Sequence, residues 1–574
     1  MYDTVQAVVI RASKVDLPGK DLDTENHELV DALTHSSAVH LQSSGPGLLA
    51  TGLIHGFGAR HTAVLWEEFN IQSPLNGTFD LGLITGFDKV SFTDRSVSAY
   101  LGTASLGGAI ILDDSQETKT TEARLSVTST ENFRASVSHS FQISKLNSKV
   151  SMSSVNNNNG FDYKWAGEKR EWLTKVKGID IKWQNEYRFN KNLRLSSNIW
   201  ISQYDRELPS SLASVKSFAD QVDDNYRYQT SLDYSSGQYT AKLSYAHFDE
   251  QLNYKTVSVD SRAKNKVNAL NFSVSVDDHK LNLSHRDDRA DANFFTTLHS
   301  RKLSTFSYQY DRQWTVGFKS RLVLTEQLHD GDWSPFLFDV STSYSTGKLL
   351  TDLSINSAYN TPTLNDLYWP QGGNPDLLPE QSYGADLRLR YIFKEGTYLS
   401  IEPYYKLVSN WILWSPGDQF WSPKNQRSVI SKGVDMEIRY ELNKHFSAGM
   451  DVTYINATIA EELIFKELEG KQLLYIPKVK ANAYFNYMFR GFQVKPQALF
   501  VSQRYTTTDN LNAVPSFVVV DLNVKKQIAF SDNNKLDIGL TIYNLLNEDY
   551  QQIEFYPMPL KYFELNLNYK INRK

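Results

Sequence analysis

Apolar and polar residues alternate with a period of two along most of the chain after residue 122. The alternation is clear at 239–245, 385–391 and 434–441. Near the carboxy-terminal end, a set of apolar residues is separated by polar ones: Phe563, Leu565, Leu567, Tyr569 and Ile571 alternate with Glu564, Asn566, Asn568 and Lys570. Because successive side chains of a strand point to opposite faces, this pattern predicts strands with one apolar and one polar face.

Such strands fit a soluble sandwich, which hides the apolar face, and a membrane barrel, which turns it towards lipid. The number of strands separates the two architectures. From Thr121 to the end we count roughly 22 alternating runs between turn signals, the strand number of the plugged outer-membrane transporters. Longer connections are expected at 156–171, 208–224, 360–381 and 416–426. We therefore predict an all-β membrane protein with a 22-stranded antiparallel transmembrane β-barrel.

The stretch from Leu53 to Leu112 is different, because its short β-runs each end at Gly, Pro or Asn. It is turn-rich and has little room for a core of its own. A barrel of this width cannot be filled by its own side chains and would leak if nothing closed it. We predict that residues 1–20 form an exposed arm, that 21–118 form a plug domain inside the lumen, and that 119–574 form the barrel.

Composition agrees with a membrane barrel. Aromatic residues make up 13 % of the chain, yet the mean hydropathy is −0.44, as expected when a polar lumen offsets an apolar outer face. A net charge of −5 gives no reason to expect a nucleic-acid partner. Because the sequence contains no Cys, we expect no disulfides, thiolate catalysis, Cys-based metal sites or lipid anchoring through an N-terminal Cys.

No apolar run approaches the ~18 residues of a membrane helix. The first residues, Met1 to Thr4, do not form a charged start followed by an apolar signal core. Because an outer-membrane protein needs such a signal, we expect this chain to be a mature or trimmed form.

Motifs in order along nearly the whole chain resemble TonB-dependent outer-membrane receptors, especially the cobalamin-receptor-like and haem-receptor-like branch. The resemblance rests on the plug stretch and on four barrel segments: Thr361–Trp369 with Gly373–Glu380, Tyr475–Pro477, Tyr543–Tyr550, and Pro557–Leu565. It implies import of a bulky small-molecule or metal-chelate cargo across the bacterial outer membrane, with the plug and N-terminus facing the periplasm. The implied partner is an inner-membrane TonB-type complex.

The resemblance also implies a TonB box in the amino-terminal arm. The best local match is Asp3, Thr4 and Val5 with Val8 and Val9. An extended β-branched run pairs edge to edge without a side-chain pocket. The alternative is a disordered tail.

His55 stands where the family usually has Arg, in the Ile-x-Gly step of the plug, and that Arg commonly belongs to a buried charge network. A His there either titrates as a weaker substitute for the Arg or leaves the plug less firmly held in the barrel.

Two sets of residues are ligand-binding candidates. At the plug apex, Arg60 and His61 align with a ligand-touching loop, and Arg60 suits a carboxylate or phosphate; equally, it suits a barrel-wall acid. Gln72, Ser73 and Asn76 follow in the next apical turn, where ordinary turn chemistry is the alternative. In the barrel, Trp411, Trp414 and Trp421 are expected around a loop. They suit stacking on a sugar, corrin or aromatic siderophore, or membership of the interfacial aromatic belt.

We predict no metal site and no cofactor. The 12 His residues have no metal-ligand spacing, and we interpret His35 and His40 as solvated plug residues. The acidic group Asp287, Asp288 and Asp291 is offset by Arg286 and Arg289 and is interpreted as a solvated face. No His lies between His329 and His445, which counts against haem as cargo.

Three functions are weighed. The first is energy-coupled import of a scarce, bulky nutrient such as a ferric siderophore or a corrinoid. The second is a plugged receptor-type barrel that acts as a structural or interaction subunit of an outer-membrane complex. The third, an outer-membrane hydrolase, lacks a nucleophile elbow or a Ser/His/Asp grouping. A surface lipoprotein partner is a further expectation, and the sequence does not identify the cargo.

Overall fold

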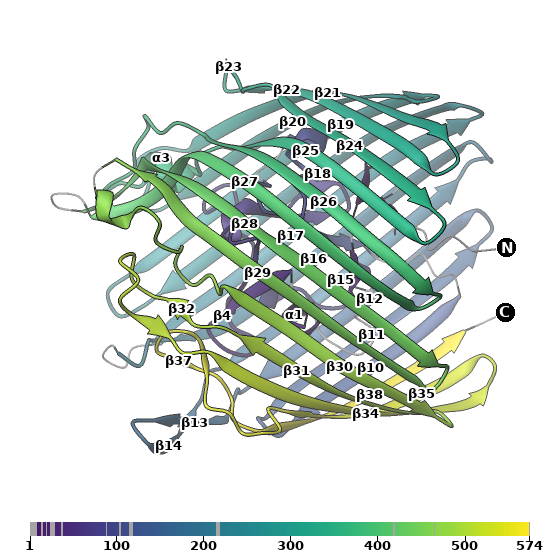
Figure 1. Ribbon diagram of the computed structural model, residues 1–574, viewed down its shortest axis with the longest axis vertical. Coiled ribbons are helices and arrows are strands. Elements are labelled where there is room, and N and C mark those ends of the chain that lie inside the picture. The colour runs from purple at the N-terminus through teal and green to yellow at the C-terminus, as the bar shows by residue number, and fades with distance from the viewer. Residues whose placement is uncertain are drawn as a thin grey trace.

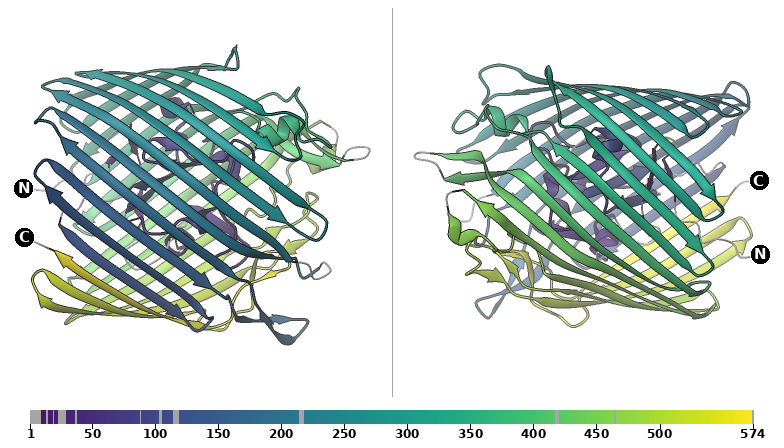
Figure 2. Two further views of the ribbon diagram at one scale, coloured as in Figure 1. Left: turned by 180° about the vertical axis from the view of Figure 1, so that it is seen from behind. Right: turned by 45° about the horizontal axis from the view of Figure 1, so that its top comes forward.

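The computed structural model shows a barrel that encloses the amino-terminal part of the chain (Figures 1 and 2). The description that follows covers residues 9–12, 15–18, 20–22, 29–35, 38–87, 89–102, 105–113, 119–213, 218–416, 420–463 and 465–572.

A closed antiparallel barrel of 22 strands forms most of the molecule. Its strands are β10 (Thr120–Thr128), β11 (Asn132–Ile143), β12 (Leu146–Asn157), β15 (Val176–Arg188), β16 (Leu193–Pro209), β17 (Phe218–Ser236), β18 (Tyr239–Lys255), β19 (Asp260–Val276), β20 (His279–Ala292), β21 (His299–Thr315), β22 (Phe318–His329), β24 (Leu337–Thr346), β25 (Leu349–Asn360), β26 (Glu380–Lys394), β27 (Thr397–Pro416), β28 (Trp421–Asn443), β29 (Phe446–Glu462), β30 (Val479–Phe489), β31 (Phe492–Val501), β34 (Phe517–Ser531), β35 (Asn534–Tyr543) and β38 (Tyr562–Asn572). The first and last strands close the barrel, with Thr120 opposite Asn572 and Thr128 opposite Glu564. The predicted fold class is confirmed.

The two ends of the barrel differ. Tight turns such as 237–238 and 277–278 join the strands at one end, where both chain termini lie (Figure 1). We call this the turn end. Longer connections gather at the other, the loop end. They contain β13 (Phe161–Trp165), β14 (Glu168–Trp172), β23 (Asp332–Trp333), α3 (Leu364–Tyr368), η3 (Lys466–Leu468), β32 (Arg504–Tyr505), β33 (Ala513–Val514), β36 (Gln551–Ile553) and β37 (Tyr556–Pro557).

The outer face of the barrel carries the apolar half of each alternating run. On β20, Leu281 and Leu283 are 52 % and 46 % exposed, whereas Asp288 on the inner face is fully buried. The same division holds on β38, where Phe563 and Leu565 are exposed and Glu564 is buried. An apolar outer band of this kind is the surface that lipid covers. Among the described residues, no helix is long and apolar enough to span a bilayer.

The plug occupies the lumen (Figure 2). Its elements are β3 (Lys20–Leu22), α1 (Leu29–Thr34), β4 (Val39–Ser43), β5 (Ala50–Ile54), η1 (Ala59–His61), β6 (Thr62–Trp66), β7 (Phe69–Asn70), η2 (Leu81–Leu83), β8 (Lys89–Thr93), α2 (Ser98–Leu101) and β9 (Gly108–Asp113). The strands β1 (Val9–Ala12) and β2 (Val15–Pro18) precede these elements and form a separate two-stranded sheet. A five-stranded sheet in the order β3-β8-β9-β6-β7 forms its centre. Its core continues into the barrel wall: the Trp66 ring centroid lies 5.7 Å from that of Trp200 on β16.

Of the candidate TonB box, Asp3, Thr4, Val5 and Val8 lie outside the described residues. Val9 begins β1, which pairs with β2 as a short hairpin. The coupling role of this segment stays a prediction.

Candidate ligand-binding site

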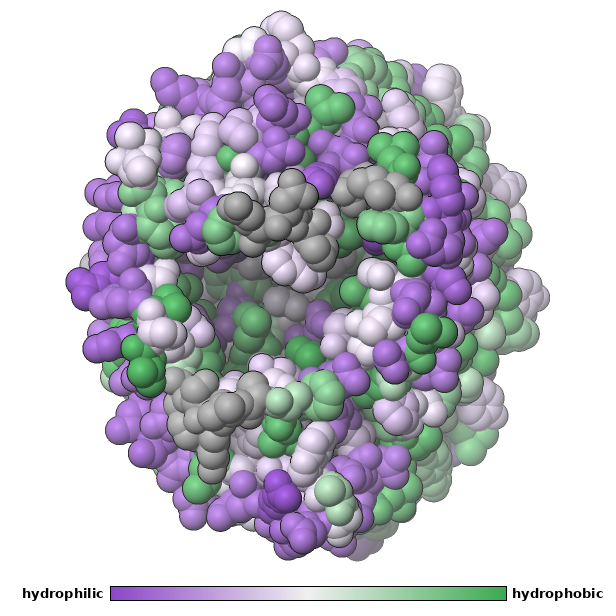
Figure 3. Space-filling model, turned by 90° about the vertical axis from the view of Figure 1, so that its left-hand side faces the viewer, coloured by the Kyte–Doolittle hydropathy of each residue, from purple (hydrophilic) through white to green (hydrophobic). Residues whose placement is uncertain are grey.

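The loop end of the barrel is hollowed at its centre (Figure 3). Within the lumen, a cavity of about 140 Å³ lies between the plug and the barrel wall formed by β18–β21. Three of the predicted plug-apex residues line it, namely Arg60, Gln72 and Ser73. His61, Asn76 and the three tryptophans are not among its lining residues.

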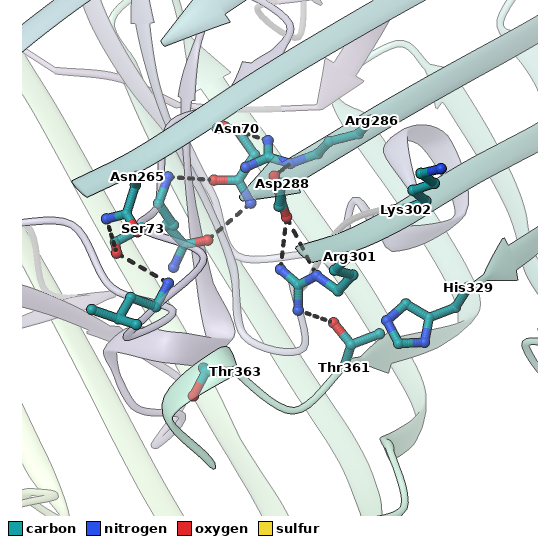
Figure 4. Close-up of polar contacts among 12 residues, drawn as sticks. Asn70, Ser73, Asn265, Arg286, Asp288, Arg301, Lys302, His329, Thr361 and Thr363 are labelled. Atoms are coloured by element: carbon teal, nitrogen blue, oxygen red, sulfur yellow. Dashed lines mark hydrogen bonds and ion pairs between the residues drawn. The ribbon is translucent and has the colours of Figure 1, made fainter. Parts of the chain in front are cut away.

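Two arginines that share one buried carboxylate form the barrel side of this cavity (Figure 4). Arg286 Nε donates to Asp288 Oδ1 at 2.7 Å, and Arg301 Nη2 donates to Asp288 Oδ2 at 2.9 Å. Arg301 Nη1 also donates to Thr361 Oγ1 at 3.0 Å, which ties the wall to the connection before α3. Arg286 Nη1 reaches the plug and donates to the Asn70 carbonyl at 2.7 Å. The guanidinium groups therefore face the cavity in fixed orientations.

On the plug side of the cavity, the side-chain amide of Gln72 holds the backbone in place. Gln72 Nε2 donates to the carbonyls of Ala59, Thr62 and Gly77 at 2.8–3.1 Å, which joins the two apical turns. Ser73 Oγ accepts a hydrogen bond from Asn265 Nδ2 of β19 at 3.1 Å. Gln72 is thus a scaffold for the apex, as the turn-chemistry alternative anticipates.

Arg60 and His61 meet acids of the barrel. Arg60 Nη2 lies 2.9 Å from Asp366 Oδ2, and His61 Nε2 lies 2.9 Å from Glu380 Oε2. Burial disfavours the charged form of Arg60, but Glu380 and Asp366 outweigh it and raise the pKa of Arg60 above its usual value. Of the two roles considered for Arg60, the structure shows the pairing with an acid of the barrel wall.

The helix α3 is joined directly to the plug apex. The backbone N–H groups of Leu364 and Asn365 donate to the carbonyls of Pro74 and Leu75, each at 3.1 Å. Asn365 Nδ2 donates to Asn76 Oδ1 at 2.6 Å. A movement of the 361–379 connection therefore reaches the plug through hydrogen bonds.

Trp411, Trp414 and Trp421 flank the connection between β27 and β28, but the long connection expected at 416–426 is shorter than predicted. Trp411 and Trp414 belong to β27 and Trp421 begins β28, because this hairpin extends to a short connection beyond Pro416. Trp411 is buried against His61 with ring centroids 4.4 Å apart, and Trp414 Nε1 donates to Asp366 Oδ1 at 2.8 Å. Trp421 is the most exposed of the three, at 60 %.

His55 retains a contact with a barrel acid. Its Nε2 lies 2.8 Å from Asp435 Oδ2, and its ring stacks on Tyr404 with centroids 3.7 Å apart. His55, Asp94 and Asp435 offer ligand atoms within 4.8 Å of one another, which is the geometry of a candidate metal site. The Lys406 ammonium already occupies this neighbourhood, because Nζ donates to the Asp94 carbonyl at 2.9 Å. A cation there would be repelled, so we assign no metal.

Two interpretations of solvated residues need correction. His40 is 6 % exposed, and burial next to Lys480 and Arg504 lowers its pKa well below the usual value. Asp288 is fully buried between Arg286 and Arg301 rather than on a solvated face. The signal for Asp288 was in the sequence, because it has the same parity as Arg286, opposite to the lipid-facing Leu281 and Leu283.

Comparison with known proteins places these features in a family. The family model described as TonB dependent receptor-like, beta-barrel matches residues 67–545. The vitamin B12 transporter BtuB of Vibrio vulnificus is 22 % identical over 72 % of this chain and 70 % of its own length. The vitamin B12 transporter BtuB of Photobacterium profundum is 27 % identical over 41 % of this chain, and the match spans 37 % of that protein.

Solved structures of receptors share the fold. The siderophore receptor PirA from Acinetobacter baumannii superposes with a TM-score of 0.78 at 13 % identity, covering 97 % of each chain. A mutant of the ferric enterobactin receptor PfeA from Pseudomonas aeruginosa gives 0.78 at 12 % identity, covering 96 % of this chain and 98 % of its own. The chain belongs to the TonB-dependent receptor family and is an outer-membrane protein, with the turn end of its barrel on the periplasmic side.

Proposed function

We propose that this protein imports a scarce, bulky nutrient, a ferric siderophore, a corrinoid or a similar compound, across the outer membrane. The supporting observation is the cavity at the plug apex, where Arg60, Gln72 and Ser73 of the plug face Arg286 and Arg301 of the barrel. A cargo that settles there contacts plug and wall together, so its binding energy can act on the plug.

The energy source in this proposal is an inner-membrane TonB-type complex that pairs, in the periplasm, with the arm at Asp3, Thr4, Val5, Val8 and Val9. The domain division into arm, plug and barrel at residues 20 and 118 belongs to the same proposal. A surface lipoprotein partner stays a prediction.

Growth on single nutrient sources tests the proposal. A strain that lacks this protein is supplied with one ferric siderophore or one corrinoid at a time, and the intact chain should restore growth on one class. A variant without residues 1–10 should bind the same cargo, measured by calorimetry on purified protein, yet fail to restore growth. If the shortened chain restores growth fully, the arm does not couple energy, and the structural or interaction role becomes the better account.

A further inference from the structure

The cavity beside β18–β21 continues from the plug apex towards the periplasmic turns. Lys242 on β18, Ser273 on β19 and Asn282 on β20 all line it and lie near the turns 237–238 and 277–278. Between these residues and the apex, the wall presents small polar side chains: Ser244, Asn271, Ser284, Thr305 and Ser307. Small inward side chains leave space between plug and wall that larger ones would fill.

An ion pair between plug and barrel lines the part of the cavity towards the periplasmic turns. Glu68, in the turn between β6 and β7 of the plug, lies 2.8 Å from Lys242 Nζ through its Oε1. Both side chains are 8 % exposed, so the pair is largely shielded from bulk water. One partner belongs to the plug and the other to the barrel, so a shift of the β6–β7 turn alone separates them.

The charges that face the cavity are mostly positive. Arg60, Lys242, Arg286 and Arg301 line it, and Glu68 is the acid among the described lining residues. The carboxylates that hold the arginines, Asp288 and Asp366, are not among the lining residues. Cationic groups at the surface of a low-dielectric cleft concentrate anions within it.

We propose that this cavity is a preformed, anion-selective passage, and that the Glu68–Lys242 pair is the gate at its periplasmic end. The proposal rests on the import function above, since a gate has a use only in a transporter, and it specifies that the cargo presents carboxylate or phosphate-like anionic groups to the passage. Withdrawal of Glu68 with the β6–β7 turn opens the gate.

Conductance across planar lipid bilayers in KCl tests the gate without cargo or an energy source. The intact protein should be silent. E68K places two ammonium groups at the gate and should produce stepwise currents, and E68Q, which nearly keeps the shape, should produce smaller ones. The charge swap E68K/K242E restores an ion pair and should abolish the current. Silence of both single variants in protein whose barrel is folded, or persistent current in the swap, would overturn the proposal.

A matched variant separates a gate from general loosening of the plug. Arg206 on β16 bonds Asp80 of the plug and Asp223 of the barrel, is 2 % exposed and does not line the cavity. R206E creates a comparable charge clash between plug and wall and should stay silent. Currents in R206E equal to those of E68K would refute the assignment. In a KCl gradient, the reversal potential of E68Q should show anion selectivity, and cation selectivity would place the path elsewhere.

The path itself can be mapped because the chain has no Cys. In the E68K background, S284C on the inner face of β20 should make the current sensitive to a charged methanethiosulfonate reagent. L281C, on the lipid-facing side of the same strand and not among the lining residues of the cavity, should not. Block in both or in neither overturns the route along β20. Failure of these tests leaves the import proposal intact, because growth on single nutrients measures import independently.

Discussion

The plug meets two stretches of the barrel wall in different ways. Against β26–β29 it is closely packed: His55 stacks on Tyr404, and a Cβ added at Gly56 would lie 2.6 Å from the Cβ of Ala457. Against β18–β21 a cavity intervenes beside small polar residues such as Ser244 and Ser284, although Phe248 of β18 packs on Trp66 with ring centroids 6.4 Å apart. The polarity of the ion pairs is reversed as well, because plug His55 meets barrel Asp435 on the packed wall, whereas plug Glu68 meets barrel Lys242 on the other.

This difference indicates where the plug is anchored to the barrel. Burying a large side chain contributes about 1.5–3 kcal/mol, and Phe57 and Trp411 belong to one buried cluster on the packed wall. A buried ion pair such as Glu68–Lys242 contributes a net free energy near zero, because desolvation offsets attraction. The plug is therefore held by packing on the β26–β29 wall, whereas the contacts that border the cavity are polar and can part at little cost.

The largest expected effect comes from filling the packed wall. Gly56 has φ +82°, and its Cβ position is blocked by Ala457. Gly56→Val should destabilise the seated plug by about 4 kcal/mol, from overpacking and left-handed strain together. Limited proteolysis of the plug in the intact protein measures this. Gly58→Ala is the control, because the nearest atom would lie 3.9 Å away; equal protease sensitivity of the two variants would show that this wall is not tight.

Removing the shared acid of the packed wall should have the next largest effect. Glu380 pairs with His61. It accepts one hydrogen bond from Asn360 Nδ2 and another, at 2.9 Å, from the Ile412 backbone N–H. Glu380→Gln keeps the shape but removes the charge, and should cost about 2 kcal/mol. Thermal unfolding followed by circular dichroism checks this. An unchanged melting temperature would mean that His61 and Arg60 find full compensation in other partners.

A third contact between plug and barrel depends on pH. Asp31 of α1 accepts a hydrogen bond from the Tyr543 hydroxyl at 3.1 Å, and burial, with Glu564 nearby, raises its pKa from 3.8 to about 6. Its protonated form is favoured in the folded protein, so this stabilisation is complete below pH 3.8 and is lost as the pH rises through about 6.

Docking of α1 should therefore weaken by about 1 kcal/mol between pH 5 and pH 7. Hydrogen exchange of the α1 amides at these two pH values measures it. In Asp31→Asn the difference between the two values should disappear once intrinsic exchange is corrected, while amides of the packed wall near Gly56 should show no such change. A variant that keeps the full difference would assign the titration to another group.

The sequence predicted the architecture better than the site, and the reason is physical. Alternation reports which face of a strand meets lipid, so Phe563 and Leu565 were assigned correctly from one strand alone. The cavity depends on contacts between distant segments, such as Arg286 with the Asn70 carbonyl, and no local pattern encodes them. Arg60, Gln72 and Ser73 were found through family resemblance.

The expectation of a long connection at 416–426 failed for a related reason. Pro, Gly and Ser near Pro416 are typical of a long connection, yet β27 and β28 continue their pairing up to Pro416 opposite Trp421. Pairing across the hairpin prevailed over the local turn signal, which a single segment of sequence cannot reveal.

The last prediction compares one substitution on both walls, and its second member, Ser73→Ala, has the smallest expected effect. Ser431 Oγ donates to the His55 carbonyl on the packed wall and is fully buried, whereas Ser73 Oγ accepts from Asn265 beside the cavity. Ser431→Ala leaves a buried carbonyl without this donor and should cost about 1.5 kcal/mol. Ser73→Ala should cost under about 0.5 kcal/mol, because water in the cavity can replace the hydroxyl. Chemical unfolding of both variants in one detergent compares them directly. Equal losses would mean that the cavity wall is as rigid as the packed wall, and the plug would then have no weak side along which to move.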